Sequence, residues 1–82
     1  MQLTPREHTL VERVTQRIKE CDPQAIVQIA ADTIEHEDIL LFVYTDKPSL
    51  EIIHHTSPCL VDILMHEELD ILVIPRDRDR GG

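Results

Sequence analysis

Glycine is almost absent from this 82-residue chain, because its only two glycines are Gly81 and Gly82. The body of the chain therefore lacks a glycine-rich loop that could hold nucleotide phosphates. Aromatic residues are equally scarce: Phe42 and Tyr44 are the only two, and there is no tryptophan. Proteins that stack single-stranded bases need more aromatic side chains than this. The two cysteines lie 38 positions apart, so they do not make a disulfide framework.

Long hydrophobic runs are also missing. The longest, from Ile39 to Tyr44, is far shorter than the roughly 20 residues of a membrane helix. No basic segment followed by an apolar core opens the chain, so we expect no secretion signal, no membrane partner and a cytoplasmic protein. The length predicts one small domain over residues 1–77, followed by a flexible tail over 78–82.

All but one of the basic residues lie near the two ends of the chain. The formal net charge is −8, and between Glu20 and Pro75 Lys47 is the only basic residue against twelve acids, a charge of −11. Binding to phosphate backbones needs lysine and arginine, so this distribution disfavours a nucleic-acid partner. It favours a basic protein partner, a metal ion, or an acidic surface that imitates nucleic acid.

The first predicted element is a helix over residues 5–21. Thr4 suits the N-cap, Pro5 the first helical position, and Glu7 completes a capping box. Apolar residues then recur at helical spacing. Pro23 ends the pattern, because the residue before a proline is pushed out of the helical region.

Two strands are predicted next. Residues 25–30 alternate between apolar and polar positions, and residues 39–44 form a continuous apolar run that indicates a strand buried on both faces. A turn follows at residues 46–49.

The second half contains an ambiguous segment. Residues 50–55 fit either a third strand or the first turns of a helix. Ser57 and Pro58 predict a helix start at this point, with the helix running over residues 59–68. Residues 69–75 predict a final strand.

The predicted order is therefore α-β-β-(β or α)-α-β. A strand, a helix and another strand in succession require a crossover and some parallel pairing. The predicted fold is α/β of the α+β type: a two-layer sandwich with a mixed sheet of three or four strands and two helices on one face. Apolar residues on both faces of the strands favour a covered second face, as in a homodimer.

Three blocks of the sequence together resemble a known family. They are the helix opening at Leu3–Glu7, the segment Asp38–Val43 that leads to Asp46-Lys47-Pro48, and the segment Leu69–Ile74. In this order and spacing, residues 3–77 resemble a minimal nucleotidyltransferase domain of the polymerase-beta-like superfamily.

The resemblance implies positions for catalytic carboxylates. Members of the family hold two divalent metals with an Asp-x-Asp pair on one strand and a third acid on a later strand. Asp38 corresponds to the first acid of the pair and Asp70 to the third acid, which would bind Mg²⁺ or Mn²⁺. Leu40 stands where the second acid belongs, and the segment Ile29–Asp32 lacks the family's Gly-Ser pair. These departures imply a catalytically inactive member that needs no cofactor.

The resemblance also implies a role, because small domains of this kind often serve as antitoxins or regulatory subunits. We expect a non-catalytic module that binds a protein partner through acidic residues, the candidates being Asp32, Glu35, Glu37 and Asp38. One alternative is a divergent metal-dependent nucleotidyltransferase that uses Asp38, Asp70 and a further acid such as Asp32 or Glu37. Another is an acidic protein that imitates nucleic acid and inhibits a nucleic-acid-binding protein.

Histidine and cysteine suggest one other site. The candidate ligands for a transition metal are His54, His55, Cys59 and His66. If residues 54–66 formed one helix, His55, Cys59 and His66 would share a face with Asp62. Pro58 argues against such a helix, so we expect these residues to be structural.

Overall fold

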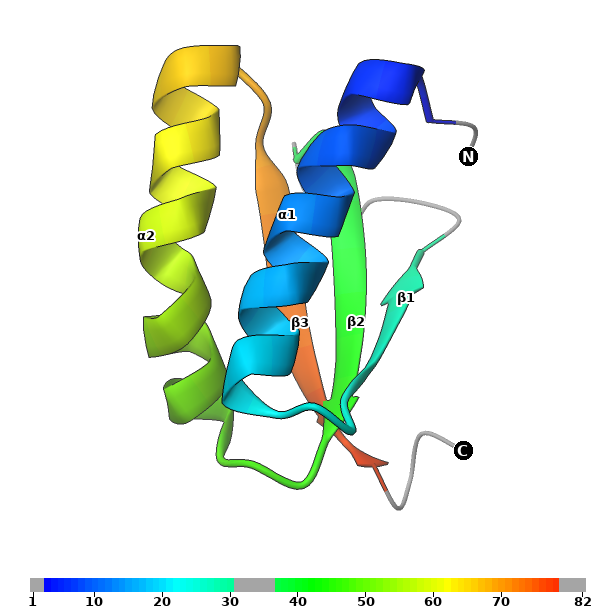
Figure 1. Ribbon diagram of the computed structural model, residues 1–82, viewed down its shortest axis with the longest axis vertical. Coiled ribbons are helices and arrows are strands. Elements are labelled where there is room, and N and C mark those ends of the chain that lie inside the picture. The colour runs from blue at the N-terminus through cyan, green and yellow to red at the C-terminus, as the bar shows by residue number, and fades with distance from the viewer. Residues whose placement is uncertain (1–2, 31–36, 79–82) are drawn as a thin grey trace.

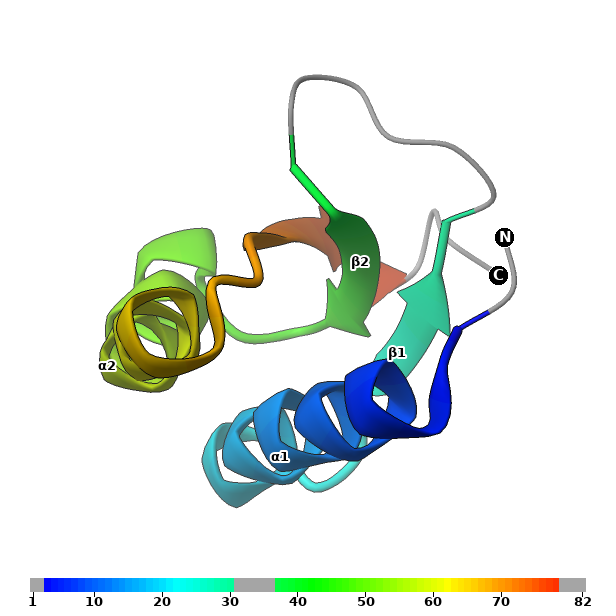
Figure 2. The same ribbon diagram turned by 90° about the horizontal axis from the view of Figure 1, so that it is seen from above.

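The computed structural model describes residues 3–30 and 37–78. Within them, two helices and three strands follow the predicted order, with the ambiguous segment helical: α1 (Pro5–Cys21), β1 (Ile26–Ile29), β2 (Ile39–Thr45), α2 (Ser49–Glu67) and β3 (Ile71–Asp77). Both helices cover the same face of the sheet (Figures 1 and 2). The predicted two-layer α+β fold with a mixed sheet is confirmed.

The sheet has the strand order β1-β2-β3, so β2 is the central strand. β1 pairs antiparallel with β2, placing Ile26 opposite Tyr44. β3 pairs parallel with β2, placing Ile39 opposite Ile71. The parallel pairing requires a crossover, and α2 supplies it.

α1 begins as its sequence predicts. The hydroxyl of Thr4 accepts a hydrogen bond from the Glu7 amide at 3.1 Å, and the Glu7 carboxylate accepts one from the Thr4 amide at 2.9 Å. This reciprocal pair satisfies two amides that the helix cannot bond internally. The helix then buries one apolar face, made by Leu10, Val11, Val14 and Ile18.

α2 contradicts the prediction of a helix start at Pro58. The helix begins at Ser49, residues 50–55 are helical, and Pro58 lies in the interior of the helix. Pro58 is exposed, so the amide hydrogen bond that proline cannot make is lost on a solvent-facing turn. The buried side chains Ile52, Thr56 and Ile63 hold the turns before and after it against the core.

β2 supplies the centre of the core. Its side chains alternate, and Ile39, Leu41 and Val43 point toward the helices with none of their surface exposed. They pack with the buried faces of α1 and α2 and with Ile71 and Val73 of β3. Both helices are therefore held against the sheet by these three side chains of β2.

A buried polar network joins α1 to the end of β2. Asp22, the C-cap of α1, is 8 % exposed, and its carboxylate accepts a hydrogen bond from the Thr45 hydroxyl at 2.6 Å. The same carboxylate accepts from the Gln24 amide at 3.0 Å, while the Lys47 amide donates to Thr45 Oγ1 at 3.1 Å. The hydrogen bond from Thr45 is the main reason that the pKa of Asp22 is lowered.

β3 begins and ends two residues later than the predicted strand at 69–75. Arg78, which directly follows it, donates a hydrogen bond to Gln24 at 3.1 Å and lies 3.6 Å from the Asp46 carboxylate. The contacts of the domain thus extend one residue beyond the predicted boundary at 77. The rest of the predicted tail, residues 79–82, lies outside the described residues.

Replacing Thr45 with valine should destabilise the protein by about 1–3 kcal/mol at pH 7, because the buried Asp22 carboxylate loses a donor. A lowered folded-state pKa gives stability that is present above the ordinary aspartate pKa of 3.8 and is lost as the pH falls through the folded value. The difference between the two proteins should therefore shrink below about pH 4. Urea unfolding at a series of pH values measures it.

The control for this experiment is Thr9→Val, which removes an exposed hydroxyl that donates to the Pro5 carbonyl within α1. It should change the unfolding free energy by less than about 0.5 kcal/mol. Equal losses in the two variants would contradict a special role for the Asp22 network.

Replacing Pro58 with alanine should stabilise the protein by about 1–3 kcal/mol, since proline is roughly 3 kcal/mol less favourable than alanine inside a helix. Thermal unfolding measures the change. Pro5→Ala is the matched control, because Pro5 occupies the first turn of α1, where proline is favourable, and no gain is expected there. A lower melting temperature for Pro58→Ala would show that the proline is part of the packing.

Candidate functional site

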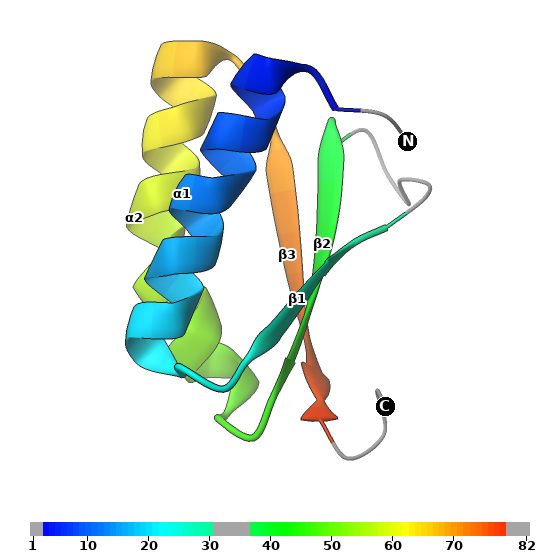
Figure 3. The same cartoon turned by 45° about the vertical axis from the view of Figure 1, so that its right-hand side comes forward.

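The face of the sheet that points away from the helices is a candidate site. Figure 3 shows both helices on the other side of the strands. Side chains alternate along each strand, so the residues next to the core-facing ones belong to this face. We call it the open sheet face; its members are Ile26, Gln28, Leu40, Phe42, Tyr44, Leu72, Ile74 and Arg76.

The open sheet face is mainly apolar. Ile26 is 57 % exposed, while Phe42, Tyr44 and Ile74 are partly exposed. Leu40 alone is buried, with 1 % of its surface exposed. The prediction that residues 39–44 are buried on both faces is therefore wrong for Phe42 and Tyr44, which a single copy of the chain leaves partly open to solvent.

The strand registers arrange this face in rows. Leu40 lies beside Leu72, and Phe42 lies between Gln28 and Ile74. In the next row, Tyr44 lies between Ile26 and Arg76. Both aromatic residues of the protein are thus in the middle of the face, on its central strand.

One cation lies over an aromatic ring at the end of the face. The guanidinium carbon of Arg76 is 4.9 Å from the centre of the Phe42 ring. Such a contact is favourable because the ring face carries partial negative charge. The open sheet face therefore combines exposed apolar rows with a positive charge at the carboxyl ends of β2 and β3.

Acidic residues lie at the opposite end of the same strands. Asp38 precedes β2 and Asp70 precedes β3, and both residues are exposed. The Asp70 carbonyl accepts from the Asp38 and Ile39 amides at 2.8 and 3.1 Å, and the Asp38 carboxylate accepts from the Asp70 amide at 2.8 Å. We call Asp38, Asp70 and the exposed Glu68 the acidic edge.

The acidic edge brings together the two residues that the resemblance singled out. Asp38 also has a structural function, since its carboxylate holds the turn that leads into β3. In the described part of the chain, no three or more acidic, histidine or cysteine side chains are grouped so that they could hold a metal ion. A site with two metals needs more carboxylates than this pair provides.

The other predicted acidic residues do not extend this edge. Asp32 and Glu35 lie outside the described residues. Glu37 is only 7 % exposed, so its inclusion in an exposed acidic surface is corrected. Of the four residues predicted to bind a partner, Asp38 is the one that the structure shows on the surface.

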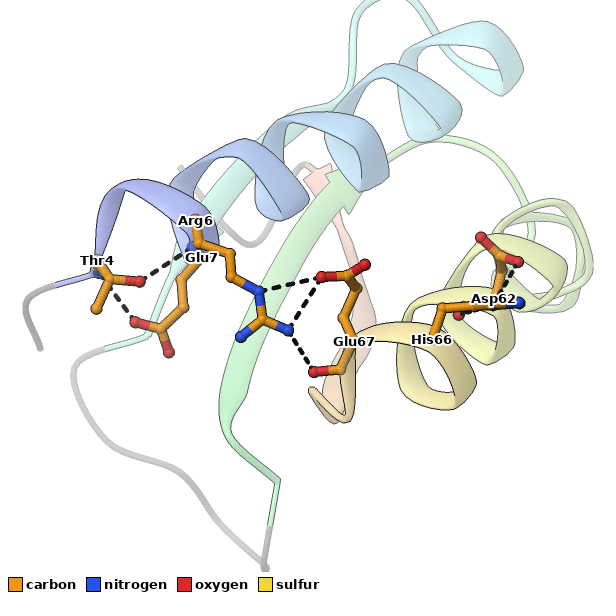
Figure 4. A network of polar contacts seen from close by, with 6 residues as sticks. All are labelled: Thr4, Arg6, Glu7, Asp62, His66 and Glu67. Atoms are coloured by element: carbon orange, nitrogen blue, oxygen red, sulfur yellow. Dashed lines mark hydrogen bonds and ion pairs between the residues drawn. The ribbon is translucent and has the colours of Figure 1, made fainter.

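The predicted histidine and cysteine ligands do not converge on a metal site either. α2 is continuous, so His55, Cys59 and His66 do share a flank of one helix. They spread over roughly 16 Å of helix, because each residue advances about 1.5 Å. His66 instead contacts Asp62 on its own helix, with Nδ1 3.0 Å from the carboxylate (Figure 4).

The other two predicted histidine ligands, His55 and His54, also lie on α2. Nε2 of His55 lies 3.5 Å from the Glu20 carboxylate of α1, a distance that makes an ion pair when the ring is protonated. This nitrogen is buried, and it has no hydrogen-bond partner among residues 3–30 and 37–78. His54 is exposed on α2.

Further charged side chains form ion pairs between α1 and α2. Arg6 of α1 contacts the Glu67 carboxylate at 3.0 Å and also donates to the Glu67 carbonyl (Figure 4). Arg13 lies 3.2 Å from the Asp62 carboxylate. These pairs are partly exposed, so each contributes at most about 1 kcal/mol. They connect α1 to α2.

Sequence reasoning missed part of the candidate site. It predicted a covered second face on the apolar strands, as in a homodimer, but it singled out none of Ile26, Ile74 and Arg76 as members of that face. The signal was present, because residues two apart in a strand share a face. What the sequence did not show was which of the two alternating sets the helices would cover.

No family model matches the chain. No curated protein and no solved structure matches it significantly either. Among the described residues, neither helix is long and apolar enough to span a membrane.

Proposed function

We propose that this protein is a non-catalytic binding module, and that it binds a protein partner with its open sheet face and the adjoining acidic edge. The observation that carries the proposal is the apolar character of the sheet face that the helices leave uncovered. Exposed apolar patches on soluble proteins commonly mark interaction sites. Aromatic residues at the centre of such a patch are frequent binding hot spots, and Phe42 and Tyr44 occupy that position here.

The charges around the face define the chemistry of the partner. Asp38 and Asp70 are exposed at one end of the strands, and Arg76 lies at the other. A complementary partner has an apolar centre, with basic residues placed against the acidic edge. This agrees with the net charge of −11 between Glu20 and Pro75.

The resemblance to a minimal nucleotidyltransferase domain indicates which kind of binding module to propose. A member that retains Asp38 and Asp70 but has Leu40 in place of the second acid suits a binding role. We therefore propose an antitoxin-like or regulatory subunit. The structural use of the Asp38 carboxylate, which accepts from the Asp70 amide, supports retention of this residue without catalysis.

Affinity capture from the native host tests the proposal. The wild-type protein and the variants Ile26→Glu, Asp70→Asn and Val61→Glu serve as bait, and each recovered protein is quantified. Ile26→Glu should reduce recovery of a specific partner about tenfold or more, because a charge enters the apolar contact. Asp70→Asn should weaken capture mainly at low salt, as expected for an exposed charge.

Val61→Glu is the matched control, because Val61 is 53 % exposed, much like Ile26, but lies on α2. Its recovery of the same partner should equal that of the wild type. A partner that binds all four baits equally, or no specific partner at all, would refute the proposed binding face.

A divergent nucleotidyltransferase is the second candidate, and the adjacency of Asp38 and Asp70 is the observation in its favour. Isothermal titration of the metal-free protein with Mn²⁺ and ATP tests it. We expect no binding heat, because two carboxylates without a phosphate-binding loop make a weak site.

The double variant with Asp38→Asn and Asp70→Asn is the control. Asparagine at position 38 keeps an oxygen that can accept from the Asp70 amide, so the variant should remain folded. Micromolar binding to the wild type that disappears in this variant would establish the nucleotide site and overturn the non-catalytic proposal.

A further inference from the structure

α2 has a second apolar face that lies apart from the core and from the open sheet face. Five large apolar side chains on it are exposed: Leu50 at 69 %, Ile53 at 38 %, Val61 at 53 %, Leu64 at 47 % and Met65 at 74 %. The core-facing residues of the same helix are Ile52, Thr56 and Ile63, all fully buried. A helix that is apolar on two faces has a second face available for packing.

This second face points away from α1. His55 and Asp62 contact Glu20 and Arg13, so they mark the side of α2 next to α1. At about 100° per residue, the exposed apolar residues lie roughly 150° around the helix axis from that side. Figure 2 shows α2 at one end of the molecule, with α1 and the sheet on the same side of it.

The order of residues along this face is symmetric. Leu50, Ile53, Ser57, Val61 and Leu64 follow one another at spacings of three, four, four and three residues. They fall within about 80° of arc around the helix. We call this row the α2 stripe; reversing it about Ser57 places Leu50 on Leu64 and Ile53 on Val61.

A symmetric row of this kind is complementary to itself. In an antiparallel pair of identical helices related by a two-fold axis, a residue before the centre faces one the same distance after it. We propose that the α2 stripe binds a second copy of this chain, with the two helices antiparallel and Ser57 at the two-fold axis. Leu50 then packs on Leu64 of the second copy, and Ile53 packs on its Val61.

Ser57 suits the centre of this pairing. Its small side chain allows the helix axes to approach to the 8–10 Å typical of packed helices. Its hydroxyl already donates to the Ile53 carbonyl at 2.7 Å, so burial leaves it satisfied.

The ends of the helix are also complementary in charge. Lys47 lies just before α2, and Glu68 is its C-cap. The antiparallel arrangement brings Lys47 of one copy to the end where Glu68 of the other copy lies. Antiparallel helix dipoles add to this attraction.

The size of the stripe sets the expected affinity. A standard interface buries about 800 Å² on each partner, and one helix face of five apolar side chains offers less. We therefore expect a dissociation constant of micromolar order or weaker, so that the dimer depends on protein concentration.

Sedimentation velocity at protein concentrations from roughly 5 to 500 μM tests the pairing, because this range includes the expected dissociation constant. The wild-type protein should shift from monomer to dimer within the range. Val61→Glu should raise the dissociation constant at least about tenfold, because a charge is placed against Ile53 of the second copy. Ile26→Glu, a change at a similarly exposed residue on the open sheet face, should leave the dissociation constant unchanged.

Two results of this experiment would overturn the proposal. One is a wild-type protein that stays monomeric over the whole range. The other is a dimer that Ile26→Glu abolishes and Val61→Glu preserves, since that assigns self-association to the sheet. Circular dichroism of each variant shows that the fold is intact.

Disulfide trapping tests the register. In a background with Cys21→Ala and Cys59→Ala, Ser57→Cys should form a covalent dimer under mild oxidation, because the two copies of position 57 meet at the axis. Leu50→Cys should not, because its copies lie roughly 21 Å apart along the antiparallel pair.

An equal mixture of the Leu50→Cys and Leu64→Cys proteins should cross-link, because these positions face each other in the proposed pair. Cross-linking by Leu50→Cys alone, with none by Ser57→Cys, would overturn the antiparallel register.

Discussion

Burial of the inward row of β2 is the interaction on which the rest of the structure depends. Ile39, Leu41 and Val43 expose none of their surface, and both helices and the neighbouring strands pack around them. An 82-residue domain buries only one thin core, so a single central strand supplies a large share of it. The Asp22–Thr45 hydrogen bond then attaches the end of α1 to the end of the same strand.

This architecture explains why the chain has exposed apolar surfaces on both of its layers. Two helices cover one face of a three-stranded sheet, and nothing in the described residues forms a third layer. The open sheet face and the α2 stripe belong to different layers of the sandwich. Under the two proposals, a partner bound to one surface does not compete with a second copy bound to the other, so the proposed dimer would present two sheet faces.

Local signals made part of the fold predictable. α1 was predicted to the residue, because a capping box at Thr4 and Glu7 and a proline after the helix act over a few residues. The helical state of residues 50–55 was not predictable, since an apolar run of that length fits either periodicity. Pro58 was misread because packing of Ile52 and Ile63 on both sides of it outweighs the local preference.

The candidate site also combines features that the sequence indicates with features that depend on the folded chain. Asp38 and Asp70 were singled out through the resemblance, and the parallel pairing of β2 and β3 places them side by side. The burial of Glu37 depends on the folded chain around it, which no local pattern reports. The symmetry of the α2 stripe was readable in the sequence only once residues 50–64 were known to lie on one helix.

The alternation along β2 has a consequence for which sequence changes this strand tolerates. Residues 39, 41 and 43 face the core, while 42 and 44 face the open side, so neighbouring positions meet two different physical requirements, core packing and surface chemistry. A change of strand register by one residue would exchange the two sets and lose both at once. The chemistry of the open sheet face can therefore change by substitution at alternate positions, whereas an insertion or deletion within the strand disrupts the core as well.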